Sequence, residues 1–172
     1  MIGQWLLAIL VGVLLSIVLS EPVHWLMSRL PGGIIPARPR SVTGLWLVPY
    51  QFEAAGNRQP EKQIVELRQV GKHVFGKTVA SIHHRDVIRG IFSHQIYFSG
   101  SWRSIKPGQI YHGTFQLIFD PEGERLRGKW LGFSDTYHVV NHGEWEWQLL
   151  SRKVRKAEKE RIVAQQFPGA AA

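Results

Sequence analysis

Between residues 44 and 147, glycine stands two residues before tryptophan four times, at GLW (44–46), GSW (100–102), GKW (128–130) and GEW (143–145). Residues i and i+2 of a strand point to the same face, so on a strand each glycine lies beside its tryptophan. The interior of a small closed barrel just accommodates side chains, and alternating a missing side chain with the largest one fills it. Glycine also permits the bending that closure requires. The spacing therefore favours a closed antiparallel barrel over an open sandwich.

Hydrophobic residues between 42 and 150 alternate with a period of two rather than 3.6. In the clearest case, Gly113, Phe115, Leu117 and Phe119 share one face of a strand with Tyr111. DPEG (120–123) is a turn sequence. We expect an all-β, lipocalin- or avidin-like barrel of about eight strands over residues 42–150. The expected strands are 43–52, 62–70, 73–82, 91–103, 109–119, 124–133 and 143–149.

Residues 2–19 contain no charged side chain. At 1.5 Å per residue this run spans about 27 Å, close to the roughly 30 Å of a hydrocarbon core. A cleaved signal peptide is the alternative, but no Lys or Arg precedes the run. Arg29, Arg38 and Arg40 follow it, which predicts a single-pass protein whose C-terminal domain is cytoplasmic. We expect a transmembrane helix over 1–21 and a linker, broken by Pro and Gly, over 22–41.

Small residues recur at every fourth position of this span. A ridge of this kind lets two helix backbones approach closely in lipid, although small residues are common in such helices. We expect the ridge to mediate oligomerisation. Its members are Ala8, Gly12, Ser16 and Ser20.

The formal charge of +8 is unevenly distributed along the chain. Residues 41–150 carry twelve Lys and Arg against ten Asp and Glu, whereas the tail, 151–172, carries six against two. The basic excess lies in the flanking segments, which favours a membrane surface over a polynucleotide as partner. We expect the tail to form a basic helix or a disordered segment that is solvated or lies on anionic lipid.

Motifs for catalysis and metal binding are missing from the sequence. There is no cysteine, which excludes thiolate catalysis and cysteine-ligated metals. No HExxH, GxSxG, Walker A or GxGxxG motif is present. His83 and His84 are adjacent, so on a strand they point to opposite faces. We therefore expect a protein that is not an enzyme and that holds neither a metal nor a cofactor.

Two charged stripes follow the same alternation. Arg125, Arg127 and Lys129 share one face of a strand, and Glu144 and Glu146 share one face of another. The basic stripe is suited to phosphate, but neighbouring strands would instead pair it with the acidic one. We favour cross-strand ion pairs on a solvated outer face.

Of the possible binding sites, a ligand site in the barrel interior is the one that the sequence supports best. Tryptophan faces are platforms on which bases stack, each worth roughly 1–3 kcal/mol. A few polar groups at a barrel mouth supply specificity, and an arginine there is suited to a phosphate. The alternative is an interior filled by the protein's own tryptophans. The candidate ligand-binding residues are Trp46, Tyr50, Thr78, Trp102, Arg103, Tyr111, Trp130 and Tyr137.

Five segments carry a family resemblance that covers residues 42–150: TGLW, IVELRQVGKHVFGK, YHGTFQLIF, GKWLG and GEWEW. With a membrane span before the barrel, the chain resembles the transmembrane β-barrel effectors of bacterial CBASS antiphage systems. The usual members carry two membrane helices before the barrel, whereas this chain has one clear span.

The resemblance implies a cytosolic sensor on a bacterial inner-membrane effector. A cyclic oligonucleotide, made by a functionally linked nucleotidyltransferase, would enter the barrel and drive homo-oligomerisation. The membrane segments would then disrupt the inner membrane and stop the cell before phage matures. The competing interpretation is a non-enzymatic scaffold or carrier, a membrane-tethered barrel that binds an apolar small ligand or a protein. It predicts a pocket without cationic groups.

Overall fold

The computed structural model describes residues 40–54, 57–108, 110–134 and 138–168, with the backbone alone for residues 51–60 and 134. The predicted transmembrane helix, its small-residue ridge and nearly all of the linker lie outside these residues. Among the described residues, no helix is both long and apolar enough to cross a bilayer.

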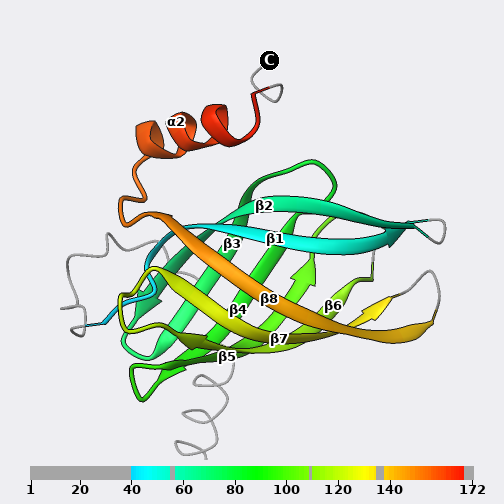
Figure 1. The fold of residues 1–172 in the computed structure, drawn as a ribbon, viewed down its shortest axis with the longest axis horizontal. Coiled ribbons are helices and arrows are strands. Elements are labelled where there is room, and N and C mark those ends of the chain that lie inside the picture. The colour runs from blue at the N-terminus through cyan, green and yellow to red at the C-terminus, as the bar shows by residue number, and fades with distance from the viewer. Residues whose placement is uncertain (1–39, 55–56, 109, 135–137, 169–172) are drawn as a thin grey trace, which may run out of the picture. The chain divides into compact units, whose positions relative to one another are not determined.

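Eight antiparallel strands close into one barrel, in which each strand pairs with its neighbours in the sequence and β8 returns to β1 (Figure 1). This confirms the predicted all-β barrel and its strand number. The strands are β1 (Gly44–Ala54), β2 (Asn57–Val70), β3 (His73–Ser81), β4 (Asp86–Ser93), β5 (Tyr97–Ser104), β6 (His112–Phe119), β7 (Arg125–Ser134) and β8 (Val139–Ser151).

One predicted strand, 91–103, is wrong, because a turn divides it. β4 ends at Ser93 and β5 begins at Tyr97. Between them, His94 and Gln95 adopt left-handed φ values of 50° and 58°. The backbone N–H of Ile96 donates to the carbonyl of Ser93 at 3.1 Å. Glycine, proline, asparagine and aspartate are all missing from this turn, so its sequence resembles continuous strand.

The period-two alternation places large apolar side chains inside the barrel. On β6, Phe115, Leu117 and Phe119 are buried, whereas Thr114 and Gln116 are exposed. Buried side chains from all eight strands join into one continuous core. Burial of this apolar surface is the main favourable contribution to folding.

Strand register sets glycines against tryptophans. Across β7 and β8, Gly143 is the direct partner of Trp130, and Gly128 is the direct partner of Trp145. A Cβ atom at Gly132 would lie 2.7 Å from the ring of Trp102, which belongs to β5. Among the four G-x-W glycines, Gly143 thus leaves room for an indole from another strand, whereas a Cβ atom at Gly100 or Gly128 would meet the backbone of the neighbouring strand.

The two ends of the barrel differ. We call the end at which β1 begins the near end; it carries Ser41 and the turns at 71–72, 94–96 and 120–123. We call the opposite end the far end; it carries the loops that follow β3 and β5. At the near end, the Arg152 guanidinium lies 5.9 Å from the ring centroid of Trp46. It also donates hydrogen bonds to the carbonyl oxygens of Ser41 and Gly123. These bonds tie the start of β1 to the segment that follows β8.

The tail forms a helix, α2 (Lys156–Gln166), that packs on the outer wall of the barrel. Ile162 and Phe167 are buried against Leu45 and Ile64. Alternation turns these two strand residues outward, because Trp46 beside Leu45 points inward. The predicted basic helix is therefore confirmed, and its apolar side is buried on the barrel rather than solvated.

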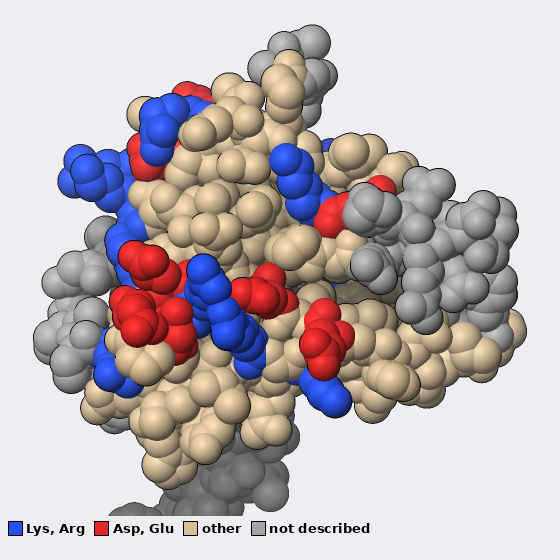
Figure 2. Space-filling view, viewed as in Figure 1, with Lys and Arg blue, Asp and Glu red and all other residues tan. Residues whose placement is uncertain are grey.

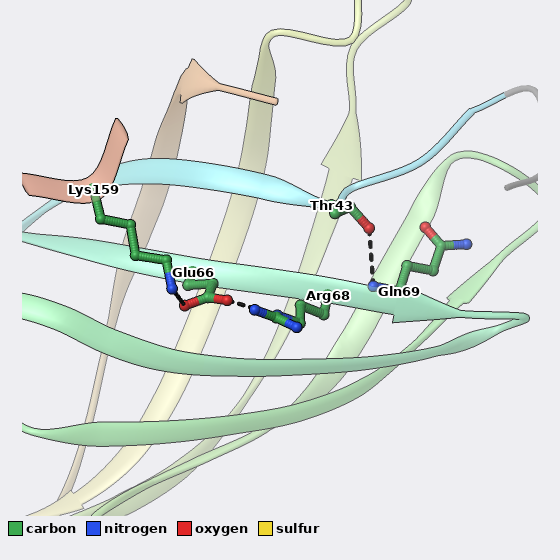
Figure 3. Close-up of polar contacts among 5 residues, drawn as sticks. All are labelled: Thr43, Glu66, Arg68, Gln69 and Lys159. Carbon is green, nitrogen blue, oxygen red and sulfur yellow. Dashed lines mark hydrogen bonds and ion pairs between the residues drawn. The ribbon is translucent and has the colours of Figure 1, made fainter. Parts of the chain in front are cut away.

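A buried carboxylate fixes α2 to β2 (Figure 3). Glu66, only 2% exposed, accepts hydrogen bonds from Lys159 Nζ and Arg68 Nε, each at 2.6 Å. Burial alone would raise the pKa of Glu66, but the hydrogen bonds from Lys159 and Arg68, with their charges, outweigh it and lower the pKa. Nearby, the Gln69 backbone N–H donates to Thr43 Oγ1 at 3.0 Å, which ties the chain before β1 to β2.

The two charged stripes lie on neighbouring strands. Arg127 is the direct partner of Glu146, and Lys129 is the direct partner of Glu144. Arg127 Nε lies 3.2 Å from a Glu146 carboxylate oxygen, and Arg125 Nη1 lies 3.6 Å from the same atom. This confirms the predicted cross-strand ion pairs. In Figure 2, basic and acidic side chains lie side by side on the face toward the viewer.

Candidate functional site

Aromatic rings fill much of the barrel interior. Trp102, Trp130 and Trp145 form a triangle whose ring centroids are 6.2 to 6.5 Å apart. At the near end, Trp46 is fully buried, and its indole N–H donates to the carbonyl of Val42 at 2.9 Å. Trp46 is therefore a core residue. This agrees with the alternative prediction, in which the protein's own tryptophans fill the interior.

Polar side chains gather at the far end of the interior. The Tyr50 hydroxyl donates a hydrogen bond to Glu61, whose carboxylate also bonds Nδ1 of His83. The Glu61 side chain is only 9% exposed. His84 packs edge-on against the Tyr50 ring, with centroids 5.0 Å apart. A phenol, a carboxylate and two imidazoles thus meet where β1 and β2 approach the loop that precedes β4.

A second carboxylate, Asp86, lies beside this group and is 6% exposed. Its backbone N–H donates to Thr78 Oγ1 at 3.0 Å, and the Thr78 hydroxyl donates to Gln63 Oε1 at 2.9 Å. The Gln63 amide donates in turn to the Asp86 carboxylate. Within the described part of the chain, Asp86 Oδ1 has no hydrogen-bond partner. We call Tyr50, Glu61, Gln63, Thr78, His83, His84 and Asp86 the far-end cluster.

Burial sets the ionisation of the far-end cluster. It raises the pKa of Asp86, against the charge of His84 and the Gln63 hydrogen bond. It lowers the pKa of His84, against the charges of Asp86 and Glu61. Burial, followed by the hydrogen bond to Glu61, raises the pKa of Tyr50 well above its usual range. These three groups are therefore held toward their uncharged forms.

A groove of about 440 Å³ lies on the outer wall of β4, β5 and β6. Arg103 lies between its direct cross-strand partners, Val87 and His112. Arg89 is a diagonal neighbour of Arg103, because its own partner is Ser101. Long side chains in such positions reach one another. The described lining residues include no carboxylate, so this groove is suited to an anion. They are Val87, Arg89, Ser101, Trp102, Arg103, His112, Gly113 and Thr114.

Four predicted ligand-binding residues lie in the interior toward the far end. Tyr50 and Thr78 belong to the far-end cluster, and the partly buried Trp102 and Trp130 pack against the core beside it. Trp46 lies apart from them, at the near end.

The other three predicted residues have different positions. Arg103 is exposed on the outer wall rather than in the interior, and it lines the groove. Tyr111 precedes β6, and its carbonyl accepts a hydrogen bond from the Ser104 N–H at 2.8 Å. Tyr137 lies outside the described residues. The predicted set is therefore divided between the core, the far-end cluster and the groove.

The prediction from the sequence did not include Glu61, Gln63 or Asp86. A signal was available for Asp86, because the alternation of Ile88, Gly90 and Phe92 extends back to it on the inner face. Its pairing with a threonine on β3 depends on the barrel's register, which one sequence does not display.

Among the described residues, no three His, Asp or Glu side chains gather into a group that could hold a metal ion. Comparison of the chain with protein-family models, with curated proteins and with solved structures finds no match. The class that the fold defines is a small, closed, antiparallel β-barrel with a docked C-terminal helix. Its two candidate sites are the far-end cluster and the outer groove.

Proposed function

We propose that this chain is a membrane-anchored sensor and that its barrel binds a cyclic oligonucleotide in the outer groove of β4, β5 and β6. The observation that carries the proposal is the basic lining: two guanidinium groups and an imidazole, with no carboxylate among the described lining residues. Guanidinium groups bind phosphate oxygens through paired, charge-assisted hydrogen bonds.

The rest of the groove supports a nucleotide-like ligand. Its volume of about 440 Å³ lies within the usual range for small-molecule sites, roughly 300–1,000 Å³. Ser101 and Thr114 contribute hydroxyl groups, and His112 contributes an imidazole ring. Histidine rings can stack on bases, so a nucleotide-like ligand has partners here for its phosphates and for a base.

The proposed output is at the membrane. Ligand binding drives homo-oligomerisation through the small-residue ridge of the predicted span, and the assembled spans disrupt the bacterial inner membrane during phage infection. A nucleotidyltransferase supplies the ligand. The charge-free run at 2–19 and the resemblance of residues 42–150 to CBASS effectors support this part. The scaffold or carrier interpretation predicts a pocket without cationic groups, and Arg89 and Arg103 in the groove disfavour it.

The test is a thermal-shift screen of the full chain in detergent micelles against cyclic di- and trinucleotides, with linear dinucleotides as controls. A ligand at about 100 times its Kd stabilises the folded state by about 2.7 kcal/mol, which is several degrees in Tm. We expect a selective rise with one cyclic ligand and its loss in Arg103→Ala.

The matched control is Arg127→Ala, which removes an outer-wall arginine that lies outside the groove and pairs with Glu146. It should keep the response. A folded protein whose Tm no cyclic ligand changes would overturn the proposal and favour the scaffold or carrier interpretation. An equal response of wild type and Arg103→Ala would place the ligand somewhere other than the groove.

A further inference from the structure

The far end of the barrel holds a buried acceptor that its own residues leave unpaired. Asp86 is 6% exposed, and its Oδ1 has no hydrogen-bond partner within the described residues. A buried acceptor without a donor is costly, and the cost is larger for a carboxylate. Gln63 and Thr78 already hold the other polar groups of Asp86 in place. The carboxylate is thus fixed, with one oxygen left for a donor from outside the described chain.

Two carboxyl groups, those of Asp86 and Glu61, lie near this oxygen. Glu61 lies close enough for its charge, with that of Asp86, to act on both Tyr50 and His84. Among the described side chains, His83 bonds Glu61, His84 acts on Asp86, and the charge of the exposed Lys106 acts on His84. Burial lowers the pKa of His84, so it opposes the carboxylates only weakly. Burial raises the pKa of Asp86, and a bound cation would offset that effect and favour the carboxylate. The far-end cluster therefore favours a cation over an anion, in contrast to the groove.

Aromatic surface adjoins the carboxylate. Trp102 lies on the inner face of β5, two residues from Ser104, which is the direct cross-strand partner of Asp86. Trp102 is partly buried and contacts Trp130 with ring centroids 6.5 Å apart. Its indole Nε1 has no hydrogen-bond partner in the described part of the chain. Aromatic faces attract organic cations, and the attraction grows when the cation is desolvated.

We infer that the far end of the barrel is a second binding site, for a small organic cation with N–H donors, such as an amine, amidine or guanidine. One donor of the ligand bonds Asp86 Oδ1, and its apolar or planar part lies against Trp102 and Trp130. This site is distinct from the groove, because the groove residues Arg89 and Arg103 project from the outer wall.

The test uses three probes of nearly the same shape that differ in charge: benzamidinium, benzamide and benzoate. Each is titrated into the full chain in detergent micelles, with Tm and tryptophan fluorescence as readouts. We expect benzamidinium to raise Tm and to change the fluorescence, benzamide to bind at least about tenfold more weakly, and benzoate to have no effect. Absence of a benzamidinium response, or equal responses to benzamidinium and benzoate, would overturn the inference.

Asp86→Asn keeps the shape of the side chain and removes its charge. We expect it to reduce benzamidinium affinity by at least about tenfold, the loss typical of a buried charge-assisted hydrogen bond. Glu144→Gln, an exposed change on β8, is the matched control and should bind like wild type. If Asp86→Asn does not fold, Trp102→Phe replaces it, and its affinity should also fall. Unchanged affinity in whichever variant folds would contradict the site.

The outer groove provides a separate control. Arg103→Ala should leave benzamidinium binding unchanged, and Asp86→Asn should leave any cyclic-oligonucleotide response unchanged. Failure of one proposal is therefore distinguishable from failure of the other. A benzamidinium response that Arg103→Ala removes would contradict the placement of the second site at the far end.

Discussion

The indole of Trp130 lies over Gly143, its direct cross-strand partner, so closely that a Cβ atom at Gly143 would be 2.8 Å from Nε1. The atoms nearest to that Cβ position all belong to this one ring. The ring itself is held by Trp102 and Trp145, at centroid distances of 6.5 and 6.2 Å. The indole therefore has little freedom to move away from a larger residue.

Gly143→Ala is expected to destabilise the barrel by about 1–3 kcal/mol, the usual effect of inserting a methyl group into a packed core. Chemical denaturation of the variant and the wild type measures the difference. Gln148→Ala, exposed on the same strand, is the control and should change stability by less than about 0.5 kcal/mol. A double variant, Gly143→Ala with Trp130→Leu, should show coupling. Strict additivity of the two changes would contradict the contact.

Lys159→Met is expected to destabilise the protein by about 2 kcal/mol, because it removes a hydrogen-bonded cation from the buried Glu66 and leaves Arg68 as its remaining partner. The matched control is Lys156→Met on the same helix. Lys156 and Glu160 are exposed and 3.8 Å apart, so their pair should contribute less than about 0.5 kcal/mol. Equal effects of the two changes on the free energy of unfolding would show that α2 is not anchored by Glu66.

Acid should weaken the same anchor. The pKa of Glu66 is lowered in the folded protein, so its stabilising contribution is present above the ordinary value of 4.5 and is lost as pH falls through the folded value. Between about pH 5 and pH 3, the wild type should lose more stability than Glu66→Gln, which has no charge to titrate. Denaturation curves across this range provide the measurement. Parallel losses in both proteins would contradict the assignment.

The fold could largely be predicted because the alternation of β6, β7 and β8 is regular in the sequence. The turn at His94 and Gln95 could not, since the segment SHQI contains no glycine, proline, asparagine or aspartate. One of its backbone hydrogen bonds, from the Phe119 N–H to the Ile96 carbonyl, comes from a different strand. The sequence of β1 contained a signal for the docking of α2, which the prediction from the sequence did not include. In the segment GLWLV, apolar residues occupy both faces of β1, and a strand with two apolar faces is covered on both sides.

The candidate sites were less predictable than the fold. Trp102 and Arg103 were identified by residue type, but adjacent strand residues point to opposite faces, so they could not both face the interior. The structure places Arg103 on the outer wall. Glu61 and Asp86 belong to different strands, and only the register of the closed barrel shows that they lie at one end. Composition identified the kinds of residue involved, and topology decided which of them meet.

The closure of the barrel also has a kinetic consequence. Every strand pair except one joins strands that are consecutive in the chain, and the exception, β1 with β8, has three paired positions against eleven between β1 and β2. Hairpins form early because their loops are short, whereas this seam requires the two ends of the domain to meet. We therefore expect the seam to form last in folding and to open first. Arg152 joins the segment after β8 to the segment before β1 and to the turn before β7, so we expect its loss to speed unfolding more than it slows folding.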